Sequence, residues 1–176
     1  MNGRPELGQP PELASLVGLR LSIIRRAVDM LILHFGSLRE IESRKPGLAQ
    51  VGEIAVHISG PWRIDGPTQT LVGRQDLFRF DGVKEPSGWS SEQGNTALDA
   101  ELDAGFGRNS ERKVWFVQGV GFEVVSTIAS RYGDLEIQFA NGFGVRAFPD
   151  STGDECWRLF VPRGNSDHLV VPDYDD

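Results

Sequence analysis

The chain has 176 residues, a formal net charge of −7 and a pI near 5.0. This length fits one domain, and the acidic balance argues against nucleic-acid binding, which depends on Lys and Arg to neutralise phosphates. The single cysteine, Cys156, excludes an internal disulfide framework. The longest apolar run, residues 30–33, is far shorter than the roughly 20 residues of a membrane span, so no membrane partner is expected.

The ends of the chain differ in composition from the region between them. Residues 1–14 contain three prolines and few apolar side chains, and residues 172–176 are mostly acidic. Both segments are therefore expected to be tails that flank one ordered domain at 15–171. The N-terminal residues lack the basic and then apolar run of a secretory signal, so we expect a cytoplasmic location.

Strand patterns dominate the first half of the domain. Residues 16–27 fit helical and strand spacing equally well, and their type stays open. Residues 27–35 predict a buried strand because both of its faces are apolar, and residues 38–50 are typical of a polar loop. Residues 54–58 alternate with the period of a half-buried strand. Gly60 and Pro61 are expected to interrupt or bulge this strand, residues 62–64 to resume it, and residues 70–80 to return as the second strand of a hairpin.

The second half combines a loop, a helix and further strands. Residues 81–95 have the composition of a long surface loop. A short helix is expected from Asn95 or Thr96 through about Ala104. Residues 114–117 and 122–128 predict two strands, or one that is broken by a bulge. Asn141 and Gly142 favour a type I′ turn between strands at 135–139 and 143–147, and residues 157–161 complete a predicted antiparallel meander.

These elements predict an α+β fold in one domain, mainly antiparallel sheet, with a C-terminal β-meander and one or two helices. Motifs for chemistry are missing from the sequence. His34, His57 and His168 lack the spacing of metal ligands, and Cys156 has no second cysteine in a redox motif and is expected to be buried and inert. We therefore predict no catalytic residue, no metal and no cofactor.

Two groups of residues are candidates for binding. Asp99, Glu101 and Asp103 form the densest acidic group of the predicted helix, and they represent either a solvated face or a docking surface for a basic protein. Trp62 and Arg63 belong to the residue types most enriched in binding hot spots. Packing of Trp62 in the core, with Arg63 paired to a nearby acid, is the alternative.

Several segments resemble those of a group of small uncharacterised bacterial proteins. They are residues 52–64, 71–76, 26–30 with 34–36, and 139–142 followed by 148–150 and 157–159. The resemblance implies a bacterial, non-secreted single domain and transfers no catalytic residue. Some small acidic proteins of this kind resemble immunity proteins that neutralise polymorphic toxins.

The leading hypothesis is a non-enzymatic protein-binding domain of immunity or adaptor type. It would contact a basic protein partner through Trp62, Arg63, Asp99, Glu101 and Asp103. One alternative is an enzyme whose site is assembled by the fold from distant residues, for example Asp29, His34, His57 and Asp76. Another is a homo-oligomeric subunit whose strand edges pair, and the oligomeric state stays open.

Overall fold

The computed structural model describes residues 11–42, 48–79, 96–107 and 113–172. The predicted loop at 81–95 and most of the two predicted tails lie outside these residues. Within them the chain forms one α-helix, two short 3-10 helices and thirteen strands, which are η1 (Leu13–Leu16), β1 (Leu21–Ala27), β2 (Met30–Phe35), β3 (Arg39–Glu42), β4 (Leu48–Val51), β5 (Ile54–Ile58), β6 (Trp62–Asp65), β7 (Thr70–Gly73), η2 (Arg74–Phe78), α1 (Ala97–Phe106), β8 (Val114–Phe116), β9 (Val124–Ala129), β10 (Leu135–Phe139), β11 (Gly144–Ala147), β12 (Trp157–Phe160) and β13 (Leu169–Val171).

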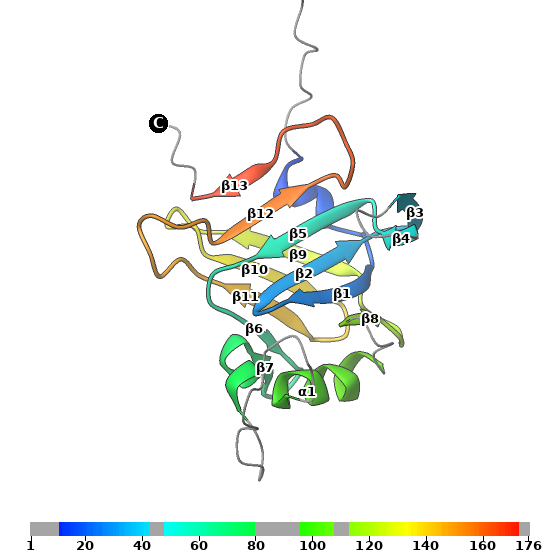
Figure 1. Ribbon diagram of the computed structural model, residues 1–176, viewed down its shortest axis with the longest axis vertical. Coiled ribbons are helices and arrows are strands. Elements are labelled where there is room, and N and C mark those ends of the chain that lie inside the picture. The colour runs from blue at the N-terminus through cyan, green and yellow to red at the C-terminus, as the bar shows by residue number, and fades with distance from the viewer. Residues whose placement is uncertain (1–10, 43–47, 80–95, 108–112, 173–176) are drawn as a thin grey trace, which may run out of the picture.

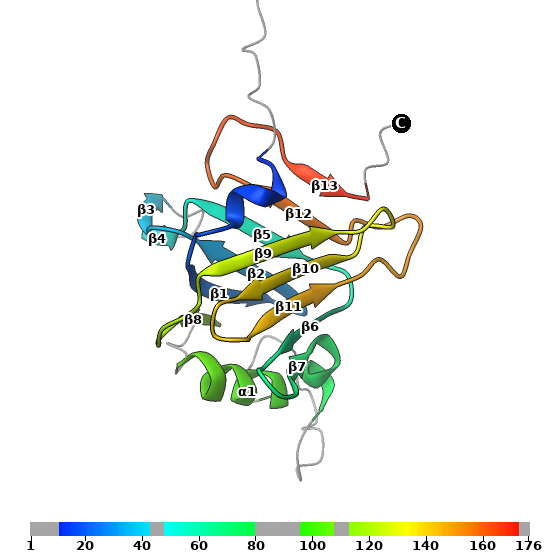
Figure 2. The same ribbon diagram turned by 180° about the vertical axis from the view of Figure 1, so that it is seen from behind.

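The described strands form two stacked antiparallel sheets and a small separate hairpin. A six-stranded sheet has the order β13-β12-β5-β2-β1-β8, a five-stranded sheet has the order β7-β6-β11-β10-β9, and β3 pairs with β4. Figure 1 shows the six-stranded sheet in front, and Figure 2 shows the five-stranded sheet from behind, with α1 below both layers. The fold is thus an α+β domain dominated by antiparallel strands, as the sequence predicted.

The hydrophobic core lies between the two sheets because strand alternation directs one row of side chains inward from each. In the six-stranded sheet, the pairing of Leu33 with Ile24 and with Val56 places three fully buried side chains side by side. In the five-stranded sheet, Val145 stands between Ile64 and Ile137 in the same way. Burial of each such side chain stabilises the fold by about 1.5–3 kcal/mol.

Helix α1 begins where the sequence predicts it. The Thr96 hydroxyl accepts a hydrogen bond from the Asp99 N–H at 3.2 Å, and the Asp99 carboxylate accepts one from the Thr96 N–H at 3.4 Å, which is a capping box. Leu98 and Leu102 are fully buried on the face toward the sheets. A Cβ on Gly105 would lie 2.7 Å from Leu71, so this glycine permits close contact between α1 and β7. The described helices are all too short or too polar to span a membrane.

Two predicted strand continuations in the first half are wrong. Gly60 and Pro61 do not bulge one strand: they carry the chain from β5 in the six-stranded sheet to β6 in the five-stranded sheet. The second strand of the hairpin ends at Gly73, where the Asp76 carboxylate accepts a hydrogen bond from the Gly73 N–H at 2.8 Å and starts η2. The segment expected to be a polar loop contributes β3 and β4, whose partners lie within that same segment.

The C-terminal meander consists of β9, β10 and β11. The predicted strand at 157–161 leaves this meander, because β12 pairs with β5 and β13 of the other sheet. Similarly, the segments at 114–117 and 122–128 are two strands in different sheets, β8 and β9, and not one strand with a bulge. Periodicity located these strands correctly, but it carried no information on their partners.

Candidate binding groove

Trp62 and Arg63, which adjoin each other in β6, point to opposite faces of the sheet. The Trp62 side chain is in the core with 4% of its surface exposed, and its Nε1 donates a hydrogen bond to the Asp29 carbonyl oxygen at 2.8 Å. Arg63 lies on the outer face, where its Nε is 3.1 Å from the Asp65 carboxylate. The core alternative therefore holds for Trp62, and of the two only Arg63 has a side chain at the surface.

The acidic group of α1 is not a shared docking surface. Asp99 is only 6% exposed, and its carboxylate contacts Arg26 Nε at 2.8 Å and Lys113 Nζ at 3.2 Å. Burial acts to raise the pKa of Asp99, but the hydrogen bonds and charges of Arg26 and Lys113 outweigh it and lower this pKa. Asp103 accepts a hydrogen bond from Trp115 Nε1 at 2.7 Å.

The side chain of Glu101 is more open to solvent than that of Asp99. The Glu101 side chain is 38% exposed and lies 4.0 Å from Arg79. The prediction of one acidic face is wrong, because Asp99 is buried beside Arg26. Arg26 points into the end of the sandwich, where its buried charge requires an acidic partner. Helical spacing along α1 carries no information about an arginine on a distant strand.

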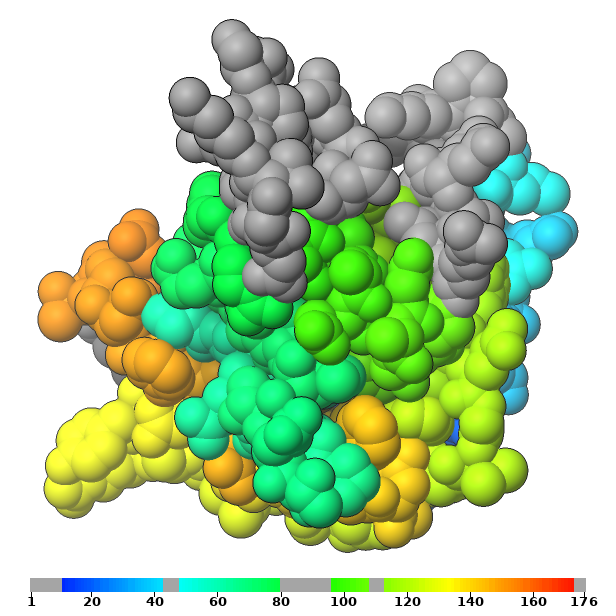
Figure 3. Space-filling view, turned by 90° about the horizontal axis from the view of Figure 1, so that it is seen from below, coloured from blue at the N-terminus to red at the C-terminus, as the bar shows by residue number. Residues whose placement is uncertain are grey.

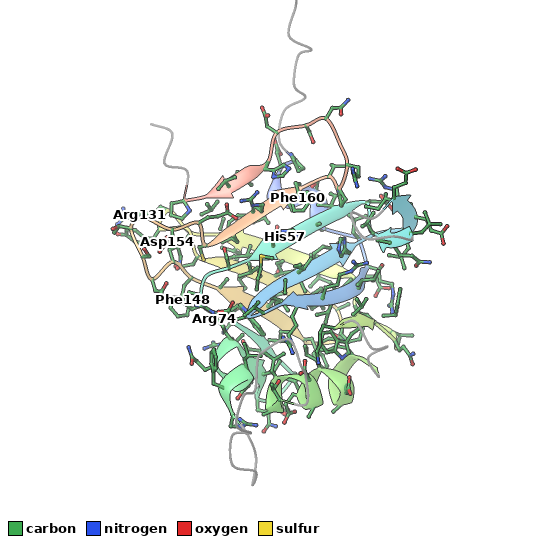
Figure 4. All side chains as sticks on the ribbon, in the orientation of Figure 1. His57, Arg74, Arg131, Phe148, Asp154 and Phe160 are labelled. Atoms are coloured by element: carbon green, nitrogen blue, oxygen red, sulfur yellow. The ribbon has the colours of Figure 1, made fainter. Side chains whose placement is uncertain are left out.

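The four residues of the alternative catalytic site do not converge. His34 and His57 point to the outer face of the six-stranded sheet, since they alternate with core residues of β2 and β5. The Asp29 carboxylate is held by Arg74 at 2.5 and 2.8 Å, and the Asp76 carboxylate is held by Arg79 at 2.7 Å. Figure 4 shows His57 on the front sheet and Arg74 at its lower left edge. Among the described residues, no three His, Cys, Asp or Glu side chains form a group that could hold a metal ion.

Both sheet histidines are held in the neutral form. His34 is 5% exposed, and its Nδ1 accepts a hydrogen bond from the Gly52 N–H at 3.3 Å. Burial, together with the charges of Arg25 and His57, lowers its pKa to about 3. Burial and the charge of Arg158 lower the pKa of His57 to about 4, and the edge of its ring meets Phe160 at a centroid distance of 4.6 Å.

These pKa values predict acid sensitivity. Below pH 6.5 the unfolded histidines bind protons that the folded ones do not, so the free energy of unfolding falls as the pH drops from about 6.5 toward 4. We expect the NMR resonances of the His34 and His57 rings to show no titration near neutral pH. A His57→Gln variant assigns the signals and should reduce the slope of stability against pH. Titration of either ring near pH 6.5 would contradict this assignment.

A groove of about 670 Å³ lies at one end of the five-stranded sheet. It is bounded by β6, the start of η2, the turn between β9 and β10, and the end of β11. Its lining residues are Pro61, Trp62, Arg63, Gly73, Arg74, Gln75, Ile128, Ser130, Asp134, Leu135, Glu136, Arg146, Ala147, Phe148 and Asp150. Figure 3, seen from below, shows the β9–β10 turn (yellow) and the loop after β11 (orange) projecting on either side of a notch.

Large apolar side chains are exposed in and beside this groove. Phe148 is 52% exposed and Ile128 is 57% exposed, and both line it. Tyr132, at the tip of the β9–β10 turn, is 69% exposed, and the Arg131 guanidinium lies 4.5 Å from the centre of its ring. Figure 4 shows Phe148 beside Arg74, and Arg131 farther along the same edge of the molecule.

The three arginines of the groove are paired within the protein. Arg74 is bound to the Asp29 carboxylate, as described above. Arg63 Nε is close to the Asp65 carboxylate, and Arg146 lies 3.5 Å from Asp65 and 3.3 Å from Glu136. These ion pairs hold the three guanidinium groups in place in the groove and neutralise much of their charge.

Sequence reasoning did not identify Phe148, Ile128 or Tyr132 as site residues. A usable signal was present for Phe148, because Val145 and Ala147 alternate inward and the next residue must face the opposite side. An aromatic residue at an outward position is a candidate contact. The signal for Tyr132 was its place in a polar turn between two strands.

Comparison of the chain with models of protein families, with curated proteins and with solved structures finds no match.

Proposed function

We propose that this chain is a non-enzymatic protein-binding domain that holds its partner in the groove at the end of the five-stranded sheet. The observation that carries the proposal is the exposure of Phe148 and Ile128 within one groove. Exposed apolar side chains that are gathered in one place, and not scattered singly, mark interaction sites. Aromatic residues and arginines are also the types most enriched in binding hot spots.

The structure of the groove supports a contact that requires little rearrangement. Arg63 is fixed by an ion pair with Asp65 within β6, and Arg146 by an ion pair with Asp65 across neighbouring strands. Phe148 is anchored through its backbone N–H, which donates to the Pro61 carbonyl oxygen at 3.2 Å. Side chains that are already ordered lose less conformational entropy when a partner binds. The groove is thus a better contact surface than helix α1, whose acidic groups are engaged internally.

Replacement of Phe148 tests the proposal. Tagged wild-type protein, a Phe148→Ser variant and a Val120→Ser control are used to capture proteins from a lysate of the source organism. Val120 is the matched control because it is 88% exposed and does not line the groove. We expect a partner that both the wild type and the control retain and that Phe148→Ser binds at least about tenfold more weakly, since a hot-spot residue contributes about 2 kcal/mol or more. Equal capture by all three proteins would contradict the proposal.

Because some small acidic proteins similar to this chain resemble immunity proteins, the proposal extends to the identity of the partner, which would be a toxin. A toxin as partner would lose its toxicity when it is co-expressed with the wild type and would keep it when it is co-expressed with Phe148→Ser. A cytoplasmic location remains part of this proposal, and fractionation of the source cells tests it.

A further inference from the structure

We infer that the groove selects a segment of the partner protein in which an apolar side chain stands beside a lysine or an arginine. This inference rests on the proposed function, because it specifies the chemistry of the segment that the same groove would bind. It is carried by the apolar side chains of the groove, by the internal pairing of its arginines and by two acidic side chains that form no ion pair within the described residues.

The apolar component of the ligand follows from the groove's exposed hydrocarbon. Phe148 and Ile128 expose more than half of their surface, and Pro61 contributes further apolar lining. Covering apolar surface contributes about 25 cal/mol for each Å² that is removed from water. An inserted leucine, isoleucine or aromatic side chain would cover these surfaces, whereas a purely charged segment would leave them exposed to water.

The charge of the ligand follows from which groups are already neutralised. Arg63, Arg74 and Arg146 each have a carboxylate within 3.5 Å. An incoming carboxylate would have to compete with these internal partners. The arginines of the groove are therefore poor receptors for an anion, and they act instead as an ordered wall of the site.

Asp134 and Asp150 provide the charge that remains. Both are exposed, both line the groove, and neither forms an ion pair with any residue in the described part of the chain. Asp134 accepts a hydrogen bond from the Ser130 hydroxyl at 2.9 Å, which orients its carboxylate. Both carboxylates act on the same buried thiol: burial raises the pKa of Cys156 to about 11, and the charges of Asp150 and Asp134 add to the increase. Because Asp134 and Asp150 both line the groove, they give it local negative charge.

The negative charge of these two aspartates then favours a cation on the partner. A lysine or arginine next to the inserted apolar residue would pair with Asp134 or Asp150, and the net charge of −7 on the whole chain would favour its approach. Each exposed ion pair raises affinity by at most about fivefold, so apolar contact supplies affinity and the two aspartates supply selectivity.

Selection from a library of random heptapeptides displayed on phage tests this inference. The wild-type protein is used as bait at moderate salt, and enriched peptides are then measured against Asp134→Asn/Asp150→Asn, Phe148→Ser and Val120→Ser. Asparagine keeps the oxygen that accepts from Ser130, and thermal melts should show that the double variant stays folded. We expect enriched peptides with Lys or Arg beside a large apolar residue. The double variant should bind them about tenfold more weakly, from up to about fivefold for each lost ion pair, and Phe148→Ser should fail to bind them.

The outcomes separate the inference from the proposed function. Enriched peptides that require Phe148 but are acidic or uncharged, and that bind the double variant normally, would overturn the inference and leave the proposed function in place. Peptides that bind Phe148→Ser as well as the wild type, or no enriched peptides, would count against both. Binding to Val120→Ser should equal binding to the wild type in every case.

Discussion

Replacing Asp99 by asparagine is expected to lower the free energy of unfolding by about 3–5 kcal/mol, the usual effect of removing one partner of a buried ion pair. The Arg26 side chain is only 1% exposed and would keep its charge without its bidentate carboxylate partner. The substitution also weakens the capping box at the start of α1. Chemical denaturation followed by circular dichroism measures the loss.

Glu101→Gln is the matched control for this prediction. Glu101 lies in the same helix, but its side chain is 38% exposed and 4.0 Å from Arg79, so its neutralisation should change stability by less than about 1 kcal/mol. A second variant, Arg26→Met combined with Asp99→Asn, removes the unpaired charge and should recover part of the loss. A change below about 1 kcal/mol for Asp99→Asn would show that the pair does not hold α1 on the sheets.

The ion pair with Arg26 also makes Asp99 contribute to the dependence of protein stability on pH. Its pKa is lowered in the folded protein, so its contribution to stability is present above the pKa of the unfolded chain and is lost as the pH falls through the folded pKa. This change has the same sign as the one predicted for His34 and His57. The histidine contribution begins at higher pH, near 6.5, so the two effects can be separated by comparing wild type with Asp99→Asn.

Replacing Trp157 by alanine is expected to destabilise the domain by about 3–5 kcal/mol, as large-to-small substitutions of buried aromatics do. Trp157 in β12 is fully buried, and its Nε1 donates a hydrogen bond to the Gly133 carbonyl oxygen at 2.7 Å. That carbonyl belongs to the β9–β10 turn, so the contact ties the six-stranded sheet to the turn that carries Tyr132 and Asp134. Thermal and chemical denaturation measure the effect.

Trp157→Phe separates packing from the hydrogen bond. Phenylalanine keeps most of the apolar volume but leaves the Gly133 carbonyl oxygen without its donor, at a cost of about 1–3 kcal/mol. Gly133 has a φ of +89°, which glycine adopts about as readily as a negative φ. The glycine by itself does not fix this shape, and the hydrogen bond from Trp157 helps to do so. The variant should therefore also weaken binding in the groove. If binding is unchanged while stability falls, the turn does not depend on Trp157 for its conformation.

Local patterns were sufficient for much of the secondary structure. Alternation identified β5, β10 and β11, the helix began at the predicted Thr96 cap, and the Asn141–Gly142 turn joins two paired strands. The predicted type I′ geometry of this turn is wrong, because Gly142 has a positive φ and Asn141 does not. These features depend on side-chain period, capping and turn chemistry, each of which acts over a few residues. The α+β class followed from their order along the chain.

The sheet partners and the site were decided by tertiary structure. The sequence predicts that Gly60 and Pro61 interrupt or bulge one strand, but packing of Trp62 between the layers makes them a crossover between the two sheets. Arg26 meets Asp99 from 73 positions away in the chain, which turns a predicted contact residue into a buried one. Periodicity shows which side chains share a face of one element, but it does not show which other element that face meets. The amino-acid sequence by itself therefore determined the elements and their buried faces, whereas the groove, its apolar wall and its exposed aspartates exist only because distant strands and turns pack together.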